Sequence, residues 1–249
     1  MFPLQDDNPT ELPPIVTMGI IAACVVVWIY VQGAGFDERL LRGSVCALGA
    51  VPAEITGFAP RPGPFACRFG GLTWGALVTS MFLHGSWMHL IGNMWFLWIF
   101  GNNIEDSMGH LRFLVFYVAT GVIAALGHVI TDPASALPIV GASGAISAVM
   151  GAYLVLYPRA RVATLFFFLF FIRIVEMPAV LFLGFWFLLQ LMSGMLQPPG
   201  TGGVAFWAHI AGFVAGVVLV FAFRDPRLVR AKRAGIRLPP GEIPYGGWF

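Results

Sequence analysis

The sequence predicts an all-α polytopic membrane protein with six transmembrane helices, and two observations predict this class. Hydrophobic residues make up 58% of the 249 residues and charged residues only 10%, which is far outside the range of soluble domains. The apolar residues also fall into six runs without charged residues, each about as long as a hydrocarbon core of about 30 Å requires. We therefore expect the lipid bilayer as a partner, and no nucleic acid.

The first of the six runs is expected to stay in the membrane as an anchor. Its leader, MFPLQDDNPTELPP, is acidic and lacks the basic region and the cleavage site of a secretory signal. Residues 1–38 contain no Lys or Arg, unlike an organellar transit peptide, so a prokaryotic plasma membrane is the expected location. The six runs are Pro14–Gly33, Ser86–Ile104, Phe113–Ile130, Gly141–Tyr157, Met177–Leu196 and Val204–Phe223.

A seventh apolar run, Val162–Ile172, is too short to cross a bilayer and is interpreted as an interfacial or re-entrant piece. The six spans divide the chain into an N-terminal segment (1–13), a membrane domain (14–223) with a long external loop (34–85), and a basic tail (224–249). We expect the proline-rich tail to be disordered.

Basic residues orient the six spans, because positively charged loops stay cytoplasmic. With an even number of spans both termini lie on one side, and the basic tail makes that side the cytoplasm. The second and fourth connections then also lie inside, with Arg112, Arg159, Arg161 and Arg173. Only the long external loop carries basic residues against this pattern, and loops of that length count less.

The external loop at 34–85 is expected to fold as a compact irregular segment, because its middle, GFAPRPGPFAC, is rich in Pro and Gly. Cys46 and Cys67 both lie in it, on the side where thiols can oxidise. Their spacing leaves both the bonded and the free state open, because a disulfide requires Cα atoms within about 7 Å. Cys24 lies inside the first span.

Four polar side chains lie near the same end of three predicted spans. Ser143 is the third residue of the fourth run, His209 is the sixth of the last run, and His89 and Asn93 begin the second. These three spans run from outside to inside, so a rise of 1.5 Å per residue places the four side chains within about 3 to 12 Å of the outer boundary. Polar and ionisable residues in a bilayer normally face the bundle interior or a wet cavity, so this co-location indicates a functional site.

Helical spacing predicts how these residues meet. His209, Gly212 and Gly216 recur at i, i+3 and i+7, which gives the last span a face with a histidine and two glycines. Ser143 and Ser147 align on the fourth span in the same way. A serine among small residues is, taken alone, more often packing material. If the face of the fourth span that carries Ser143 packs against the face of the last span that carries His209, the serine hydroxyl meets the imidazole.

Four segments, ordered along spans two to six, combine glycines with polar residues: HGSWMHLIGNMW, GNNIEDSMG, GASG and AHIAGFVAG. They resemble the HxxxxHxxxN, GxxxExxxG, GxSG and AHxxGxxxG motifs of the rhomboid family of intramembrane serine proteases. The positions that match are His84, His89 and Asn93; Gly101, Glu105 and Gly109; Gly141, Ser143 and Gly144; and His209, Gly212 and Gly216.

The resemblance implies a rhomboid-like bundle that cleaves transmembrane segments of other proteins near the outer leaflet. Ser143 would be the nucleophile and His209 its general base, because serine is a weak nucleophile until a neighbouring base takes its proton. The backbone N–H of Ser143 and the side chains of His89 and Asn93 would stabilise the oxyanion. His84 would brace the loop or the site by hydrogen bonding.

The sequence predicts a catalytic dyad and not a triad. Glu105 and Asp106 lie at the far end of the second span, too deep to orient His209. Some relatives place an aromatic residue four positions after the serine, where it stacks on the histidine. Ser147 occupies that position here, so the sequence leaves the orientation of His209 open.

Two other functions compete with proteolysis. A non-catalytic rhomboid-like binder of transmembrane segments needs only the fold, although the pairing of Ser143 with His209 argues against it. A metal transporter would use His84, His89 and His209 as ligands, yet the spans lack the carboxylates that a cation path usually has. We therefore expect no metal and no cofactor. The substrate and the oligomeric state are not given by the sequence.

Overall fold

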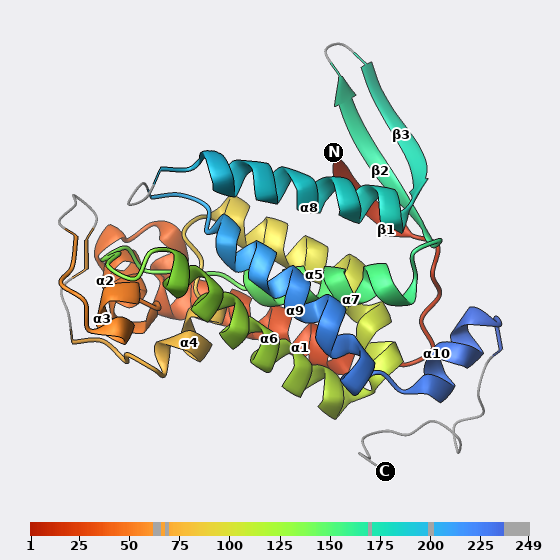
Figure 1. Ribbon diagram of the computed structural model, residues 1–249, viewed down its shortest axis with the longest axis horizontal. Helices are drawn as coiled ribbons and strands as arrows, with labels where there is room; N and C mark the ends of the chain where they lie inside the picture. The colour runs from red at the N-terminus through yellow and green to blue at the C-terminus, as the bar shows by residue number, and fades with distance from the viewer. Residues whose placement is uncertain (62–65, 68–69, 169–170, 199–201, 237–249) are drawn as a thin grey trace.

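Each of the six long apolar runs contains a helix, and these helices lie side by side in one bundle (Figure 1). The computed structural model describes residues 1–61, 66–67, 70–168, 171–198 and 202–236. A π-helical turn, η1 (Val27–Val31), prolongs the first helix. The six helices are α1 (Ile15–Val26), α5 (Trp87–Met108), α6 (His110–Thr131), α7 (Ser143–Leu156), α8 (Ala179–Leu196) and α9 (Phe206–Phe223).

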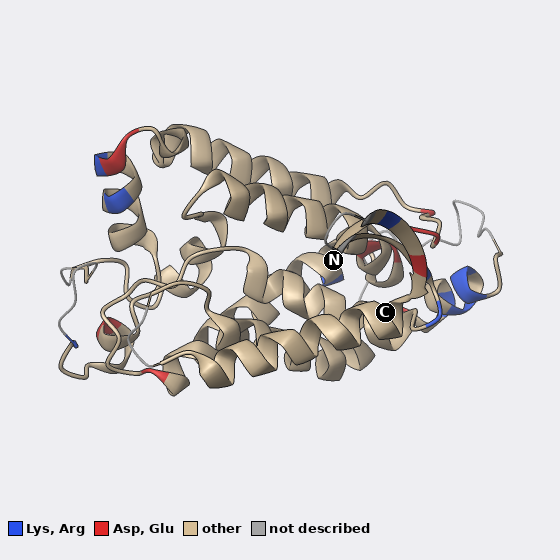
Figure 2. Cartoon of the chain, turned by 90° about the horizontal axis from the view of Figure 1, so that it is seen from above, with Lys and Arg blue, Asp and Glu red and all other residues tan. Residues whose placement is uncertain are grey.

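The bundle is suited to a membrane. Among the described residues, α6, α8 and α9 are long and apolar enough to cross a bilayer, whereas Ile15–Val31 and α7 are shorter apolar helices. Helix α5 carries the acidic pair Glu105 and Asp106 in its last turn. Charged residues gather at the two ends of the bundle and leave the helices between them almost free of charge (Figure 2). This distribution keeps ionised groups out of a hydrocarbon core, where they are costly.

Helix α7 is the central helix, and it packs against α5, α6, α8 and α9. All of its residues from Gly144 to Tyr153 are buried. Many of them are Gly, Ala or Ser, and small residues let neighbouring backbones approach closely. The helix that begins with Ser143 is therefore held on several sides.

The connection between α1 and α5 is folded into short helices. It contains α2 (Glu38–Leu48), α3 (Pro52–Thr56) and α4 (Ala76–Thr79), with 3-10 turns η2 (Gly33–Gly35) and η3 (Ser80–Phe82). The prediction that residues 34–85 lack regular elements is wrong. Local capping explains part of the difference: the side chain of Asp37 accepts hydrogen bonds from the first backbone N–H groups of α2.

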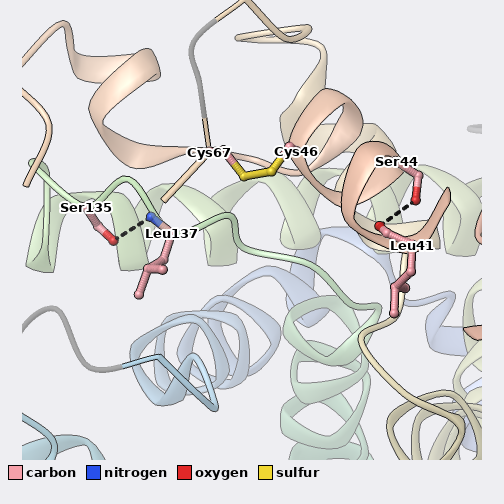
Figure 3. Close-up of a disulfide and its surroundings, with 6 residues drawn as sticks. All are labelled: Leu41, Ser44, Cys46, Cys67, Ser135 and Leu137. Atoms are coloured by element: carbon pink, nitrogen blue, oxygen red, sulfur yellow. Dashed lines mark hydrogen bonds between the residues drawn. A yellow bond between two sulfur atoms is a disulfide. The ribbon is translucent and has the colours of Figure 1, made fainter. Parts of the chain in front are cut away.

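A disulfide ties this connection together (Figure 3). Cys46 and Cys67 are bonded, with Cα atoms 5.3 Å apart, and Cys24 is a buried free cysteine. The backbone N–H of Cys67 also donates to the carbonyl of Ala136 at 3.1 Å. The disulfide-bonded segment is thus attached to the connection between α6 and α7, which leads directly to Ser143.

The chain also contains a three-stranded antiparallel sheet in the order β1–β2–β3. It consists of β1 (Phe2–Asp6), β2 (Arg161–Phe168) and β3 (Phe171–Pro178). The all-α prediction is wrong here, because the described residues of the run Val162–Ile172 belong to β2 and β3, two paired strands that project from the bundle (Figure 1). The run is rich in Phe and also contains Val, Thr and Ile, all of which favour strands. Its partner β1 lies near the N-terminus.

The tail contains a helix, α10 (Pro226–Arg233). The prediction of disorder over 224–249 is wrong for this helix, and residues 237–249 lie outside the described residues. Asp225 caps α10 by accepting a hydrogen bond from the backbone of Arg227. The charge and the prolines of the tail indicated disorder and gave no sign of α10.

A buried ion pair holds α10 against α5. The Lys232 ammonium donates to Asp106 Oδ2 and to Asn103 Oδ1, both at 2.7 Å. The backbone N–H groups of Glu11 and Leu12 donate to the same Asp106 carboxylate. One carboxylate at this end of α5 therefore fixes both the N-terminal segment and the tail.

Candidate active site

Ser143 and His209 meet at the end of the bundle opposite α10. Ser143 is the first residue of α7, and His209 lies in the first turn of α9. The distance from Ser143 Oγ to His209 Nε2 is 2.8 Å, which is a hydrogen bond. Both side chains are only partly buried. A serine hydroxyl that donates to an imidazole nitrogen is arranged to lose its proton to that nitrogen.

Glycines bring α7 and α9 close enough for this contact. A Cβ on Gly216 would lie 2.0 Å from the carbonyl oxygen of Ala148, and one on Gly212 would lie 2.1 Å from that of Gly144. Backbone therefore touches backbone at both positions, as the glycine spacing of α9 predicted. Gly144 faces α6, because a Cβ there would lie 2.7 Å from Ala124 Cβ.

Two hydrogen-bond donors of α5 converge beside the serine. A Cβ built on Gly141 would lie 2.7 Å from His89 Nε2 and 3.5 Å from Asn93 Nδ2, so both nitrogens face the same small volume two residues before Ser143. Asn93 Nδ2 is buried and has no hydrogen-bond partner among the described residues. A buried donor without a partner is costly, and an oxygen of a bound substrate would satisfy it.

The backbone of Gly85 sets the tautomer of His89. Its N–H donates to His89 Nδ1 at 3.3 Å. Because Nδ1 accepts this bond, the proton of a neutral imidazole lies on Nε2, which is the nitrogen that faces Gly141. The first N–H groups of a helix have no partner within the helix, so the backbone N–H of Ser143 is available on the same side.

His84 lies beside the site, whereas Glu105 lies at the opposite end of the bundle. The His84 ring contributes no hydrogen bond to the predicted bracing, because neither ring nitrogen has a partner among the described residues. Its ring packs edge-on against His89, and its backbone exchanges two hydrogen bonds with the side chain of Gln32. Glu105 lies at the α10 end of the bundle, where it accepts hydrogen bonds from Thr17 and ties α5 to α1.

A third side chain, which was not predicted from the sequence, contacts the imidazole. Gln190 Oε1 lies 2.7 Å from His209 Nδ1, on the other side of the ring from Ser143. One turn earlier on α8, Trp186 lies beside the same ring, with centroids 6.0 Å apart. The spacing of Trp186 and Gln190 at i and i+4 was visible in the sequence. Nothing there showed, however, that this face of α8 turns towards His209.

Ser147 is hydrogen-bonded within its own helix. Its hydroxyl donates to the carbonyl of Ser143 at 2.6 Å within α7. The aromatic contacts of His209 come instead from Trp186 and from Phe206, which packs edge-on against it. These neighbours answer the question of orientation that the sequence left open.

The three histidines of the metal hypothesis are arranged differently. His84 and His89 are in edge contact, whereas His209 bonds Ser143 and Gln190. In the part of the chain that the structure describes, no group of three or more His, Cys, Asp or Glu side chains is placed to hold a metal ion.

A serine hydroxyl hydrogen-bonded to an imidazole, next to converging N–H donors, resembles the arrangement found in serine hydrolases, and here it lies in an apolar helical bundle. Residues 72–226 match the model of the Rhomboid domain. The chain belongs to the rhomboid family, whose members are generally intramembrane serine proteases.

Known proteins of several sources are similar to this chain. It is 30% identical over 146 residues to "Putative rhomboid protease YdcA" of Bacillus subtilis (strain 168), covering 58% of this chain and 63% of that protein. It is 32% identical over 158 residues to the chloroplastic Rhomboid-like protein 11 of Arabidopsis thaliana, covering 59% and 52%. A third relative is the mitochondrial Presenilin-associated rhomboid-like protein of Bos taurus, 34% identical over 92 residues, covering 36% and 24%. The chain thus spans about half to two thirds of the length of the first two relatives.

Proposed function

We propose that this chain is a serine endopeptidase that cleaves transmembrane segments of other membrane proteins near the outer leaflet. The observation that carries the proposal is the hydrogen bond of 2.8 Å between Ser143 Oγ and His209 Nε2. It joins the two residues that the family motifs assign to nucleophile and base. The chemistry needs no metal and no cofactor.

Acylation begins when Ser143 Oγ attacks the scissile carbonyl carbon while His209 Nε2 takes the hydroxyl proton. The carbonyl electrons move to the oxygen, and a tetrahedral intermediate forms. As the intermediate collapses, the C–N bond breaks and His209 gives its proton to the leaving amine. Water then attacks the acyl-enzyme with the same help from His209, and Ser143 is released.

The oxyanion is stabilised by donors that are in place before the reaction. His89 Nε2 and Asn93 Nδ2 face one volume beside Gly141, and the backbone N–H of Ser143 lies at the start of α7. Such preorganised donors lower the barrier because they need little rearrangement as charge develops. Removal of one donor from an oxyanion hole typically lowers kcat by about 10²- to 10³-fold.

The six apolar helices α1, α5, α6, α7, α8 and α9 cross the membrane in this proposal. Both termini lie in the cytoplasm of a prokaryotic cell, and the disulfide-bonded connection lies outside. The basic residues of α10 support this orientation. The Ser143 end of α7 is then close to the outer surface, where hydrolytic water can enter.

The substrate is a transmembrane segment of another protein. A helix hides its carbonyl carbons within its own hydrogen bonds, so the segment must unwind locally before Ser143 can attack. We therefore expect cleavage where small or helix-breaking residues weaken the outer end of the substrate helix.

The test is cleavage of a panel of single-span proteins by the purified chain in detergent. Ser143→Ala and His209→Ala are expected to lower the rate by about 10³-fold or more, because each removes one half of the reacting pair. Ser147→Ala is the matched control, since it removes a hydroxyl one turn along α7 that bonds only the backbone. It should cleave at nearly the wild-type rate.

Retention of full cleavage by Ser143→Ala would rule out the serine mechanism. Two other results would favour the competing functions. Absence of cleavage by the wild type, together with binding of transmembrane segments that Ser143→Ala does not change, would identify a non-catalytic binder. Metal-dependent transport that survives Ser143→Ala would identify the histidines as ion ligands.

A further inference from the structure

The side chain of Gln190 completes a chain of hydrogen bonds through the imidazole of His209. Gln190 Oε1 lies 2.7 Å from His209 Nδ1, and His209 Nε2 lies 2.8 Å from Ser143 Oγ. The three side chains come from α8, α9 and α7. We propose that Gln190 is the positioning residue of the active site, an amide that occupies the place of the acid in a triad; this inference rests on the proposed protease function.

The bond to Gln190 selects the productive form of the histidine. Nε2 can take the serine proton only if it carries a lone pair, so the imidazole proton must lie on Nδ1. An amide oxygen only accepts hydrogen bonds, and Gln190 Oε1 therefore holds the proton on Nδ1. In the other tautomer, Nε2–H would point at Ser143 and could not act as a base.

Gln190 also fixes the plane of the ring. A bond to Nδ1 from one side and to Nε2 from the other leaves the imidazole little freedom to rotate. Trp186, four residues before Gln190 on the same face of α8, packs beside the ring. These two residues of α8 orient His209. Ser147, at the position where some relatives have an aromatic residue, bonds the backbone.

The amide carries no charge, which distinguishes it from a catalytic aspartate. It holds the Nδ1 proton throughout the reaction and neither gains nor loses one. It stabilises the imidazolium that forms during proton transfer only through its dipole. A carboxylate at the same position would accept the same bond with a full negative charge, and hydrogen bonds to charged groups are about twice as strong.

The position of Gln190 makes α8 part of the active site. The fully buried residues of α8 are Ala179, Phe182 and Leu183 near its beginning and Gly194 near its end. The turns between them, which carry Trp186 and Gln190, are covered only in part. The site is therefore complete only while this part of α8 lies against α9.

A polar residue between membrane helices can also serve only to hold the helices together. Kinetic measurements distinguish this packing role from the positioning role. The full-length wild type and variants at position 190 are compared in detergent with one cleaved single-span substrate, together with their melting temperatures. Gln190→Leu has nearly the same volume but no acceptor. We expect it to lower kcat by about 10- to 100-fold, the cost of leaving the Nδ1–H without its partner, with KM unchanged within about twofold.

Two further variants make the result specific. Gln190→Glu restores an acceptor of the same reach and is expected to recover kcat to at least half of the wild-type value. Leu189→Ala, the matched control, shortens the neighbouring exposed residue of α8 and should change kcat by less than about twofold. If Gln190→Leu does not fold, Gln190→Asn takes its place, because its oxygen is too short to reach Nδ1, and the same loss is expected.

The inference is overturned if Gln190→Leu retains kcat within about twofold of the wild type while its melting temperature falls, which would mark a packing contact only. It is also overturned if Gln190→Glu is no better than Gln190→Leu. Failure of the proposed function looks different: the wild type itself would then not cleave any substrate.

Discussion

At the scale of single residues, the backbone of Gly141 prepares the site. Its φ is +120°, and a Cβ there would lie 2.7 Å from His89 Nε2. Any other residue would strain the backbone and also push against His89, a proposed donor to the oxyanion. The GxSG motif thus contains one glycine that the local geometry requires.

Gly141→Ala is expected to lower kcat at least tenfold and to cost about 1–3 kcal/mol of stability, because the alanine must adopt a strained conformation. The matched control is Gly92→Ala, since a Cβ at Gly92 meets nothing within 4 Å although it lies next to Asn93. The control should keep full activity and gain up to about 1 kcal/mol of helix propensity. Equal activity of the two variants would contradict this account of Gly141.

Asp6 gives a prediction at the α10 end of the bundle. Its Oδ2 accepts hydrogen bonds from Asn103 and from the Tyr153 hydroxyl. Burial, the largest cause, raises the pKa of Asp6 from 3.8 to about 6. Between these values the folded chain holds a proton that the unfolded chain has released. The free energy of unfolding contributed by Asp6 therefore falls as pH rises from about 4 to about 6.

Asp6→Asn removes this titration while its amide oxygen can still accept both bonds. The melting temperature of the variant minus that of the wild type should therefore rise across pH 4 to 6 and level off above. Thermal unfolding in detergent at a series of pH values measures it. A difference that stays constant over this window would show that Asp6 titrates alike in both states.

At the scale of the elements, the contact between α7 and α9 decides whether serine and histidine meet. Gly216→Ala would place a methyl group 2.0 Å from the carbonyl oxygen of Ala148, so the helices must separate. We expect a loss of about 1–3 kcal/mol and a marked fall in kcat, because a small displacement of His209 breaks the geometry of proton transfer. Gly184→Ala on α8, whose Cβ would meet nothing within 4 Å, should change neither quantity. Unchanged stability and kcat in Gly216→Ala would contradict the close contact.

The helices could be predicted from the sequence, whereas several contacts between elements could not. Long apolar runs located six helices, and glycine spacing predicted the contact of α7 with α9, because both signals are local. The pairing of β1 with β2 joins segments that are far apart in the sequence, with Phe2 opposite Leu165, so no local pattern indicated it. The contact of Gln190 with His209 depends on how α8 is rotated, which hydrophobicity alone does not specify. The disulfide was one of two open alternatives until the Cα separation was known.

At the scale of the whole molecule, the proposed orientation places α2–α4 outside and α10 in the cytoplasm. Two single cysteines test it: Phe58→Cys in the disulfide-bonded connection and Arg230→Cys on α10, both at exposed positions. The native cysteines are either bonded or buried, so they should not react. A membrane-impermeant maleimide should label Phe58→Cys on intact cells and Arg230→Cys only after permeabilisation. The reverse pattern would invert the topology.

The central claim is that His209 activates Ser143, and covalent labelling tests it most directly. A fluorophosphonate should modify the folded wild type, with the adduct mapped to Ser143 by mass spectrometry. Ser143→Ala should not be labelled, and His209→Ala should be labelled far more slowly, because the hydroxyl then lacks its base. An unlabelled wild type, or equal labelling rates with and without His209, would contradict the account.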